Sequence, residues 1–174
     1  MGMAEGYRVL LSEEALRARV KEMGARIARD YAGRRPVLVG VLKGSFVFMA
    51  DLVRAIDLPL EVDFIGITSY EGTESTGVVR ITQDLARSVE GKDVLLVEDI
   101  VDTGLSMRYL LDNLATRHPA SVKVCALLEK PSRARVTVPI DYRGFAIEDV
   151  FVVGYGLDHD GTGRNLPFVG VPVR

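Results

Sequence analysis

One stretch, residues 94–106 with the sequence VLLVEDIVDTGLS, constrains the fold of this chain more than any other. It opens with four apolar residues, a run that is typical of a short buried strand. Three carboxylates follow within five positions, at Glu98, Asp99 and Asp102, and a turn of small residues comes next. From position 107 onwards, apolar residues fall at i, i+3, i+4 and i+7, which is helical spacing. The stretch therefore predicts a strand, a loop and a helix, in that order.

The turn and the carboxylates point to one composite ligand. Backbone N–H groups in a Thr/Gly/Ser turn, together with the positive end of the following helix, suit a phosphate group. Carboxylates repel phosphate, so Glu98, Asp99 and Asp102 need sugar hydroxyls, a bridging Mg²⁺ or a transferable proton. A ligand that carries phosphate, ribose hydroxyls and a metal-bound group satisfies all of them. The alternative is an acidic strand end beside an ordinary helix N-cap.

The whole-chain properties exclude several classes of protein. A length of 174 residues suits a single domain, and a net charge of −2 gives no drive toward nucleic acid or membrane. No window approaches 18 uninterrupted apolar residues, and the N-terminus lacks the basic and apolar regions of a secretory signal. The single cysteine, Cys125, rules out internal disulfides and fits a reducing cytoplasm. It lies in the apolar run 122–128, so we expect a core residue.

Strand and helix patterns alternate along the chain. Helices are predicted from the N-cap Ser12 to about residue 31, over 46–56 and over 107–116, and strands over 37–42, about 60–68, 78–82, 94–97, 122–128 and 151–153. Residues 69–77 are expected to form a loop, 139–149 to be irregular, and the tail from 159 to contain no element. This alternation predicts an α/β fold with a mostly parallel sheet, which binds ligands at the carboxyl ends of its strands.

Other common sites lack support. The sequence contains no G-x-x-x-x-G-K-[ST] motif, and no G-x-G-x-x-G follows the first strand, which disfavours Walker ATPases and dinucleotide-binding folds. His118 and His159 lack metal-ligand spacing, and neither Ser45 nor Ser106 has a histidine at a spacing that suggests a hydrolase triad.

Residues 98–106, EDIVDTGLS, resemble the phosphoribosyl-pyrophosphate (PRPP) signature of type I phosphoribosyltransferases. Further motifs are similar to those of the bacterial hypoxanthine-guanine branch of that family: LKGS at 42–45, SY at 69–70, LEKPSR at 128–133 and FVVGYGLD at 151–158. The motifs occur in the right order and cover nearly the whole chain. The signature points to PRPP, and the later motifs favour a purine.

This resemblance implies one phosphoribosyltransferase domain over 1–174. Its core, at about 35–130, has a mostly parallel central sheet flanked by helices, and the terminal segments form a small hood. The implied reaction is purine salvage by a glycosyltransferase: PRPP and hypoxanthine or guanine give IMP or GMP and pyrophosphate, with Mg²⁺ as cofactor. The resemblance also implies a cytoplasmic homodimer or homotetramer that binds neither nucleic acid nor membrane.

The resemblance assigns roles to individual residues. The 5′-phosphate is expected at Asp102, Thr103, Gly104, Leu105 and Ser106; ribose hydroxyls and Mg²⁺ at Glu98 and Asp99; pyrophosphate at Lys43, Gly44 and Arg164; the purine at Lys130, Phe151, Val152 and Asp158; and loop closure at Ser69 and Tyr70. Asp158 is also expected to hold a second Mg²⁺. In this family the peptide bond before Lys43 is often cis.

Several of these roles follow a chemical argument. Lys130 has only donors, so it matches the O6 acceptor of hypoxanthine or guanine and opposes the 6-amino group of adenine. Phe151 is expected to stack on the base, and the main chain of Val152 to contact its opposite edge. Asp102, beside the phosphate loop, is the candidate general base for the proton that leaves the purine ring at N7.

The chain departs from the family pattern in two places. Residues 159–164 carry two glycines where relatives usually have aromatic residues, which affects the alignment of Arg164 and the second-metal geometry. Gln83 and Ala86 stand where a lysine and an acid are more common.

Two other functions remain open at this level. One is a regulator that keeps the fold and binds RNA or a nucleotide effector, which the lack of a basic cluster disfavours. The other is a uracil or adenine phosphoribosyltransferase, which Lys130 and Phe151 disfavour.

Overall fold

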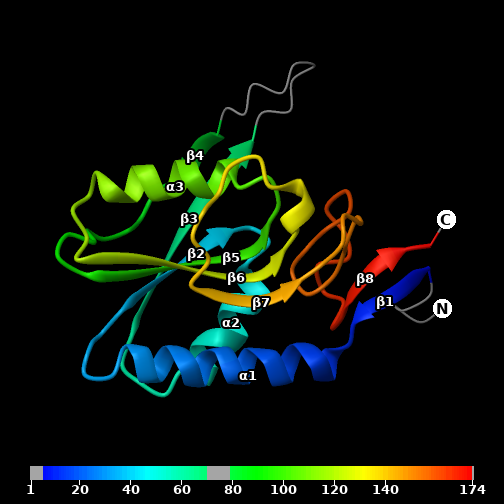
Figure 1. Ribbon diagram of the computed structural model, residues 1–174, viewed down its shortest axis with the longest axis horizontal. Helices are drawn as coiled ribbons and strands as arrows, with labels where there is room; N and C mark the ends of the chain where they lie inside the picture. Colours follow the sequence, from blue (N-terminus) through cyan, green and yellow to red (C-terminus); the bar gives the residue numbers. More distant parts are fainter. Residues whose placement is uncertain (1–5, 70–78, 174) are drawn as a thin grey trace.

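The computed structural model describes residues 6–69 and 79–173, and of Ser69 only the backbone. Figure 1 shows a central sheet with α3 on one face and α1 and α2 on the other. The elements are β1 (Tyr7–Leu11), α1 (Glu13–Asp30), β2 (Val37–Leu42), α2 (Phe46–Ala55), β3 (Glu61–Ser69), β4 (Val79–Gln83), β5 (Asp93–Val101), α3 (Leu105–Ala115), β6 (Ser121–Glu129), the 3₁₀ turn η1 (Pro131–Arg133), β7 (Tyr142–Ala146) and β8 (Val169–Pro172).

The central sheet has the strand order β4-β3-β2-β5-β6-β7. Strands β2, β3, β5, β6 and β7 run parallel to one another, and only β4, at the edge beside β3, runs antiparallel. This arrangement confirms the predicted α/β class with a mostly parallel sheet. Each face of the sheet has its own apolar core, one under α1 and α2 and one under α3.

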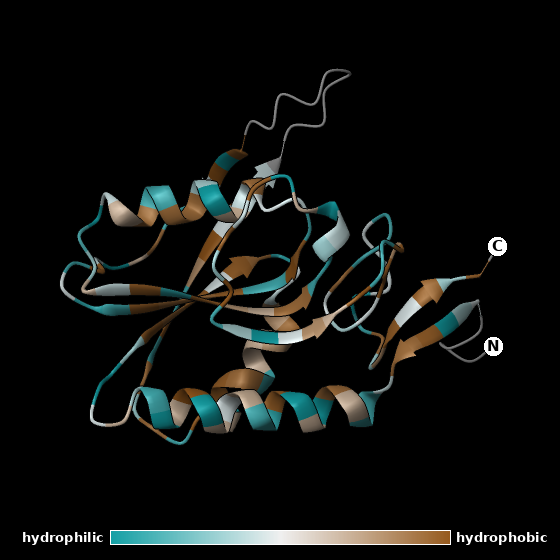
Figure 2. Cartoon of the chain, viewed as in Figure 1, coloured by the Kyte–Doolittle hydropathy of each residue, from teal (hydrophilic) through white to brown (hydrophobic). Residues whose placement is uncertain are grey.

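The helices follow their sequence patterns. The Ser12 hydroxyl caps α1 by accepting a hydrogen bond from the Ala15 N–H at 3.2 Å, as its position predicts. Leu16 and Ile27 of α1 are fully buried against the sheet. Figure 2 shows apolar and polar residues mixed along α1, as expected for a helix that buries one side only.

The register of the strands brings the predicted site loops together. Gly40 of β2 pairs with Val97 of β5, so both strands end at the same edge of the sheet. On the other side of β5, Val101 pairs with Glu129 of β6. The segments that follow β2, β5 and β6 therefore meet at the carboxyl edge.

Three parts of the predicted element order are wrong. Residues 139–149 contain strand β7, in which Tyr142 is buried and pairs with Cys125 of β6. Residues 151–153 form no strand and make only an isolated bridge from Val153 to Gly170. Strand β5 is longer than predicted and runs through the carboxylates to Val101, because β6 continues to pair with it there.

The terminal segments contain two strands that the sequence pattern did not predict. β1 and β8 pair antiparallel as a separate two-stranded sheet. Figure 1 places this small sheet at one end of the molecule, beside the irregular segment that precedes β8. It is the hood of the expected fold class. No helix in the described part of the chain is long and apolar enough to cross a membrane.

Candidate active site

The predicted phosphate loop and carboxylates line one cavity of about 220 Å³. Its walls come from the ends of β2 and β5 and from the start of α3, and they include Gly44, Glu98, Asp99, Asp102, Thr103, Gly104 and Ser106. A larger cavity of about 460 Å³ lies between α1, α2 and the segment around Leu166. That larger cavity contains none of the three carboxylates, so the smaller one is the candidate site.

The start of α3 has the features of an anion site. Gly104, the N-cap, has a left-handed φ of +84°, and a Cβ there would lie 2.6 Å from the carbonyl oxygen of Val136. No acidic residue occupies the first turn, and the N-cap Gly104 has no side chain to cap it. Among the described residues, the Thr103 hydroxyl accepts from the first N–H of the helix, that of Leu105, at a long 3.4 Å. The first N–H groups of α3 are therefore oriented for a phosphate, with Thr103 and Ser106 in the same cavity wall.

Glu98 and Asp99 form a buried acidic pair at the end of β5. Glu98 is only 9% exposed, and its carboxylate accepts from the Asp99 N–H at 3.1 Å. The Asp99 carboxylate accepts from the Ile100 N–H at 2.7 Å. Burial raises the pKa of both carboxyls, and the Asp99 charge raises the pKa of Glu98 further. An added cation would relieve this repulsion.

The donor set fits Mg²⁺ in part. Among the described residues, no three His, Cys, Asp or Glu side chains are grouped so as to hold a metal by themselves. Carboxylate oxygens are ligands that Mg²⁺ accepts, and Mg²⁺ commonly takes one or two of them while keeping water and substrate oxygens. Glu98 and Asp99 match that pattern.

Gly44 lies against this acidic pair. The peptide bond between Leu42 and Lys43 is cis, as in many members of the family that the motifs resemble. A Cβ at Gly156 would approach the Gly44 carbonyl oxygen to 2.2 Å. The loop after β2 is therefore packed between β5 and the segment after Val153, and the Lys43 side chain is exposed beside it.

Arg164 is tied to the same region despite the glycines before it. Its guanidinium pairs with the Asp158 carboxylate at 2.9 Å and donates to the Gly156 carbonyl at 2.7 Å. It is also near enough to Asp99 to lower the pKa of that carboxyl, against the larger effect of burial. The second oxygen of Asp158 accepts from the Gly161 N–H at 2.8 Å, so both oxygens of this carboxylate are engaged.

Three of the four purine-site candidates, Lys130, Phe151 and Val152, differ in exposure. Lys130 is 8% exposed, and its backbone N–H donates to the Val101 carbonyl at 3.0 Å. Phe151 is 55% exposed and meets the ring of His159 edge-on at 5.3 Å between centroids. Val152 is buried in the core. Within the apolar run at 151–153, the Phe151 ring is thus exposed, whereas the two valines are buried.

Arg133 and Asp149, which had no predicted role, contact the predicted site residues. Arg133 Nε lies 2.8 Å from Asp102 Oδ1, and Lys130 Nζ lies 3.6 Å from Asp149 Oδ1. A sequence signal existed for Arg133, because it belongs to the LEKPSR motif. Asp149 carried no signal, since it lies in a segment that was expected to be irregular.

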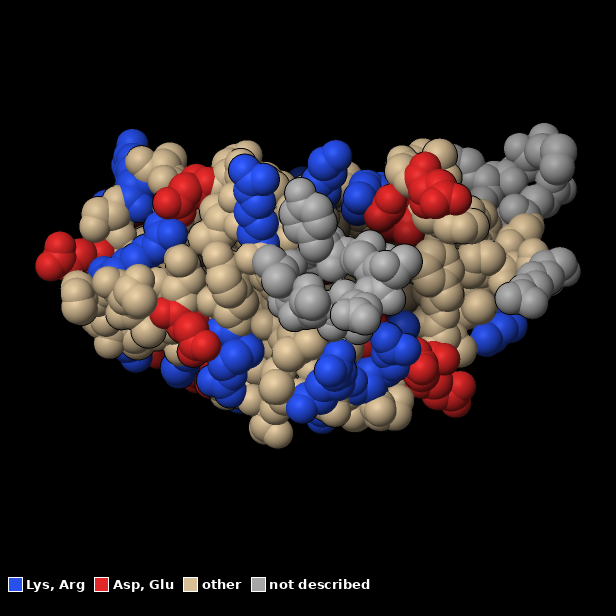
Figure 3. All heavy atoms as spheres, turned by 90° about the horizontal axis from the view of Figure 1, so that it is seen from above, with Lys and Arg blue, Asp and Glu red and all other residues tan. Residues whose placement is uncertain are grey.

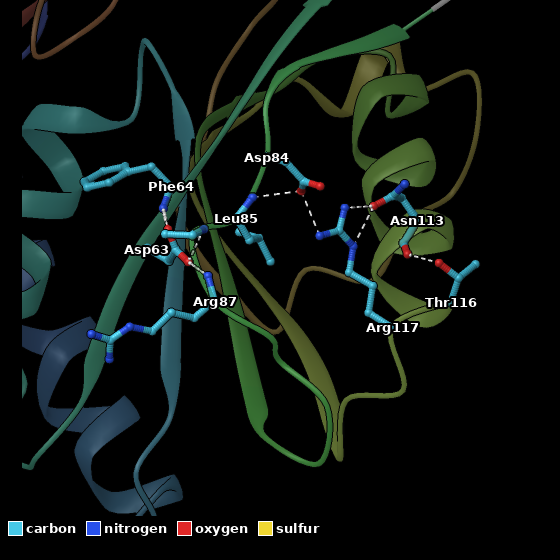
Figure 4. Close-up of polar contacts among 9 residues, drawn as sticks. Asp63, Phe64, Asp84, Leu85, Arg87, Asn113, Thr116 and Arg117 are labelled. Carbon is cyan, nitrogen blue, oxygen red and sulfur yellow. Dashed lines mark hydrogen bonds and ion pairs between the residues drawn. The ribbon is translucent and has the colours of Figure 1, made fainter.

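The departures at Gln83 and Ala86 flank Asp84 and Leu85 in the sequence, and polar contacts anchor this segment, as Figure 4 shows for Asp84 and Arg117. The Asp63 carboxylate accepts from the backbone N–H of Ala86 at 2.9 Å, an interaction that does not depend on the side chain at 86. Asp84 pairs with Arg117 at 2.7 Å, and so joins the segment to the end of α3. Of the loop candidates, the Ser69 side chain and Tyr70 lie outside the described residues.

The face shown in Figure 3 carries Lys and Arg side chains interspersed with Asp and Glu.

Comparison with known proteins places the chain among its relatives. A family model described as a phosphoribosyl transferase domain matches residues 7–160. The chain is 47% identical over 165 residues to the hypoxanthine-guanine phosphoribosyltransferase of Bacillus subtilis, covering 94% of this chain and 92% of that protein. It is similarly 47% identical to a bifunctional TilS/HprT protein of Listeria innocua, but spans only 26% of that protein.

A solved structure adds the fold-level match. Hypoxanthine phosphoribosyltransferase from Trypanosoma cruzi, in complex with the product IMP, superposes with a TM-score of 0.91 at 44% identity, covering 97% of this chain and 96% of that one.

Proposed function

The chain belongs to the phosphoribosyltransferase family, in its hypoxanthine-guanine branch, and on that premise we propose that it transfers the 5-phosphoribosyl group of PRPP to hypoxanthine or guanine. The products are IMP or GMP and pyrophosphate, as purine salvage requires. One observation carries the proposal beyond the family match: the α3 N-terminus and three carboxylates line a single cavity. A ligand that has both a phosphate and ribose hydroxyls uses both halves of it.

PRPP is held by this chain as follows. The N–H groups and hydroxyls of residues 102–106 bind the 5′-phosphate, while Glu98 and Asp99 face the ribose 2′- and 3′-hydroxyls. Lys43, Gly44 and Arg164 bind the pyrophosphate. Arg164 reaches it by exchanging its present partner, Asp158, for an anionic phosphate oxygen. That exchange also frees Asp158.

Mg²⁺ is the proposed cofactor. Glu98 and Asp99 would hold one ion, and Asp158 would be the carboxylate available for a second. When bound, Mg²⁺ offsets the charge that develops on the leaving pyrophosphate. The buried pair supports the first assignment, because a cation would compensate two carboxyls whose pKa values burial raises.

The purine is recognised by a hydrogen-bond donor, an aromatic ring and a main-chain segment. Lys130 donates to O6, Phe151 stacks on the ring and the Val152 main chain contacts the opposite edge. A 6-amino group in place of O6 opposes the Lys130 donors, which rejects adenine by up to roughly 10⁴-fold in a closed site. The high exposure of Phe151 and the low exposure of Lys130 support these roles.

The transfer step then needs charge stabilisation and one proton acceptor. Pyrophosphate leaves ribose C1, which becomes cation-like, and Lys43 and Arg164 stabilise the developing negative charge. The purine attacks through N9, and Asp102 accepts the proton from N7.

A turnover assay tests this function. The protein is mixed with Mg²⁺ and PRPP, and with hypoxanthine, guanine, xanthine, adenine or uracil in separate reactions, and nucleotide formation is followed. We expect product from hypoxanthine or guanine and none from adenine or uracil. No product from either 6-oxopurine, together with retention of RNA, would favour the regulator instead.

The quaternary state and location are part of the same proposal. We expect a homodimer or homotetramer in the cytoplasm, which light scattering of the purified protein and fractionation of cells would test. The single buried cysteine, Cys125, supports a reducing compartment.

A further inference from the structure

Four charged residues form a chain of ion pairs around the proposed purine site: Asp102, Arg133, Asp149 and Lys130, here called the Asp149 network. Arg133 Nε lies 2.8 Å from Asp102 Oδ1. A terminal nitrogen of Arg133 lies 3.7 Å from Asp149 Oδ2, and Lys130 Nζ lies 3.6 Å from Asp149 Oδ1. The network contains two cations and two anions, so its charges balance.

The members of the network differ in their access to water. The Lys130 side chain is only 10% exposed, so its ammonium needs a partner, and Asp149 supplies one. Arg133 and Asp102 are 45% and 40% exposed, respectively, so a ligand can displace this pair at low cost. Of the four residues, Lys130 therefore depends most on having a partner of opposite charge.

The network conflicts with the proposed reaction. A bound 6-oxopurine needs Lys130 at O6 and Asp102 at N7, yet each of these is paired to another residue of the network. If the purine takes both, one cation and one anion remain, Arg133 and Asp149, and they already lie 3.7 Å apart. The exchange therefore leaves no charge without a partner.

We propose that Arg133 and Asp149 are positioning residues, which hold Asp102 and Lys130 while the base site is empty and pair with each other when a 6-oxopurine engages both. This inference rests on the proposed function. It adds two residues, neither of which touches the purine, that control when the proton acceptor and the specificity lysine become available.

The exchange makes opposite predictions for the two single variants. In Asp149→Asn, Arg133 has only Asp102 as an anionic partner and retains it, so kcat for hypoxanthine falls roughly fivefold, the effect of one exposed ion pair. In Arg133→Gln, Asp149 has only Lys130 as a partner and retains it, so the KM for hypoxanthine rises roughly fivefold while kcat does not fall.

The double variant separates positioning from general structural damage. In Arg133→Gln/Asp149→Asn both restraints are gone, so kcat exceeds that of Asp149→Asn and KM lies below that of Arg133→Gln. A purely structural role predicts losses that add or grow. Arg143→Gln is the matched control, because Arg143 forms an exposed ion pair at 2.7 Å with Glu129, outside the network, and we expect it to change neither parameter.

The steady-state kinetics of the wild-type protein and these four variants, with hypoxanthine varied at saturating PRPP, decide the matter. Recovery in the double variant supports the exchange. Additive losses in an active wild-type protein overturn the exchange alone. Absence of PRPP-dependent turnover in the wild-type protein overturns the proposed function and the exchange with it.

Discussion

Gly44 lies so close to Asp99 that no side chain fits at position 44: a Cβ there would lie 1.7 Å from Asp99 Oδ2. The Asp99 carboxylate of β5 thus occupies the space that a side chain at position 44, in the loop after β2, would fill. Register places these segments side by side, since β2 and β5 are adjacent parallel strands.

Gly44→Ala is expected to displace the Asp99 carboxylate and to raise the KM for PRPP about tenfold or more, because a ribose and metal ligand moves. Steady-state kinetics with varied PRPP measures this. In an Asp99→Ala background the same substitution should add little, because the clashing carboxylate is gone. A similar loss in both backgrounds would show that Gly44 acts by another route.

Asp102→Asn is expected to lower kcat by about 10²–10⁴-fold, the usual contribution of a positioned general base. PRPP binding should be largely kept, because the backbone of the phosphate loop is unchanged. Turnover and calorimetric PRPP binding on the same preparation distinguish the two effects. A wild-type rate in this variant would remove the general-base role.

Lys130→Ala is expected to reduce kcat/KM for hypoxanthine by about 10- to 100-fold, since a hydrogen bond from a charged donor is lost. PRPP affinity should survive, and the discrimination against adenine should weaken. Competition assays with hypoxanthine and adenine measure both quantities. Unchanged kinetics would refute the base-reading role.

Tyr31→Phe is expected to stabilise the fold at neutral pH by about 1 kcal/mol. The Tyr31 hydroxyl is buried and has no hydrogen-bond partner among the described residues, so its removal relieves an uncompensated desolvation. Tyr142→Phe is the matched control: its hydroxyl donates to Asp30 at 2.7 Å, and we expect that variant to lose stability. Urea unfolding of both variants measures the difference.

The gain in Tyr31→Phe should increase in alkali. Burial raises the pKa of Tyr31 from 10.0 to about 12. Between these values the unfolded chain loses the phenol proton while the folded chain keeps it, so Tyr31 makes the wild-type protein less stable as pH rises. Phenylalanine removes that contribution. An equal gain at neutral pH and above pH 10 would contradict this account.

Local patterns sufficed for those parts of the fold that local forces determine. The strand at 37–42 is apolar throughout because it is covered on both faces, and the Ser12 cap depends on a neighbour three residues away. The pairing of β1 with β8 joins positions such as Tyr7 and Pro172, which no local window contains. The strand β7 was missed because its exposed and buried residues do not alternate regularly.

The same limit applies to the candidate site. The phosphate loop and the acidic pair are contiguous in sequence, so their proximity and their chemistry could be predicted from the sequence alone. Asp102, Arg133 and Asp149 meet only because β5, β6 and β7 are successive neighbours in the sheet. A network that spans three strands leaves no spacing signal in the sequence.

The pairing of β1 and β8 gives the backbone the topology of a nearly closed ring. Just outside the pair, the Val173 N–H donates to the Gly6 carbonyl at 2.8 Å, so the chain returns to its own beginning. A short linker across this point would allow the chain to be opened at another exposed turn, by circular permutation, with every neighbour in the central sheet retained. The point at which the backbone is opened is thus separable from how the phosphate loop and the carboxylates are brought together.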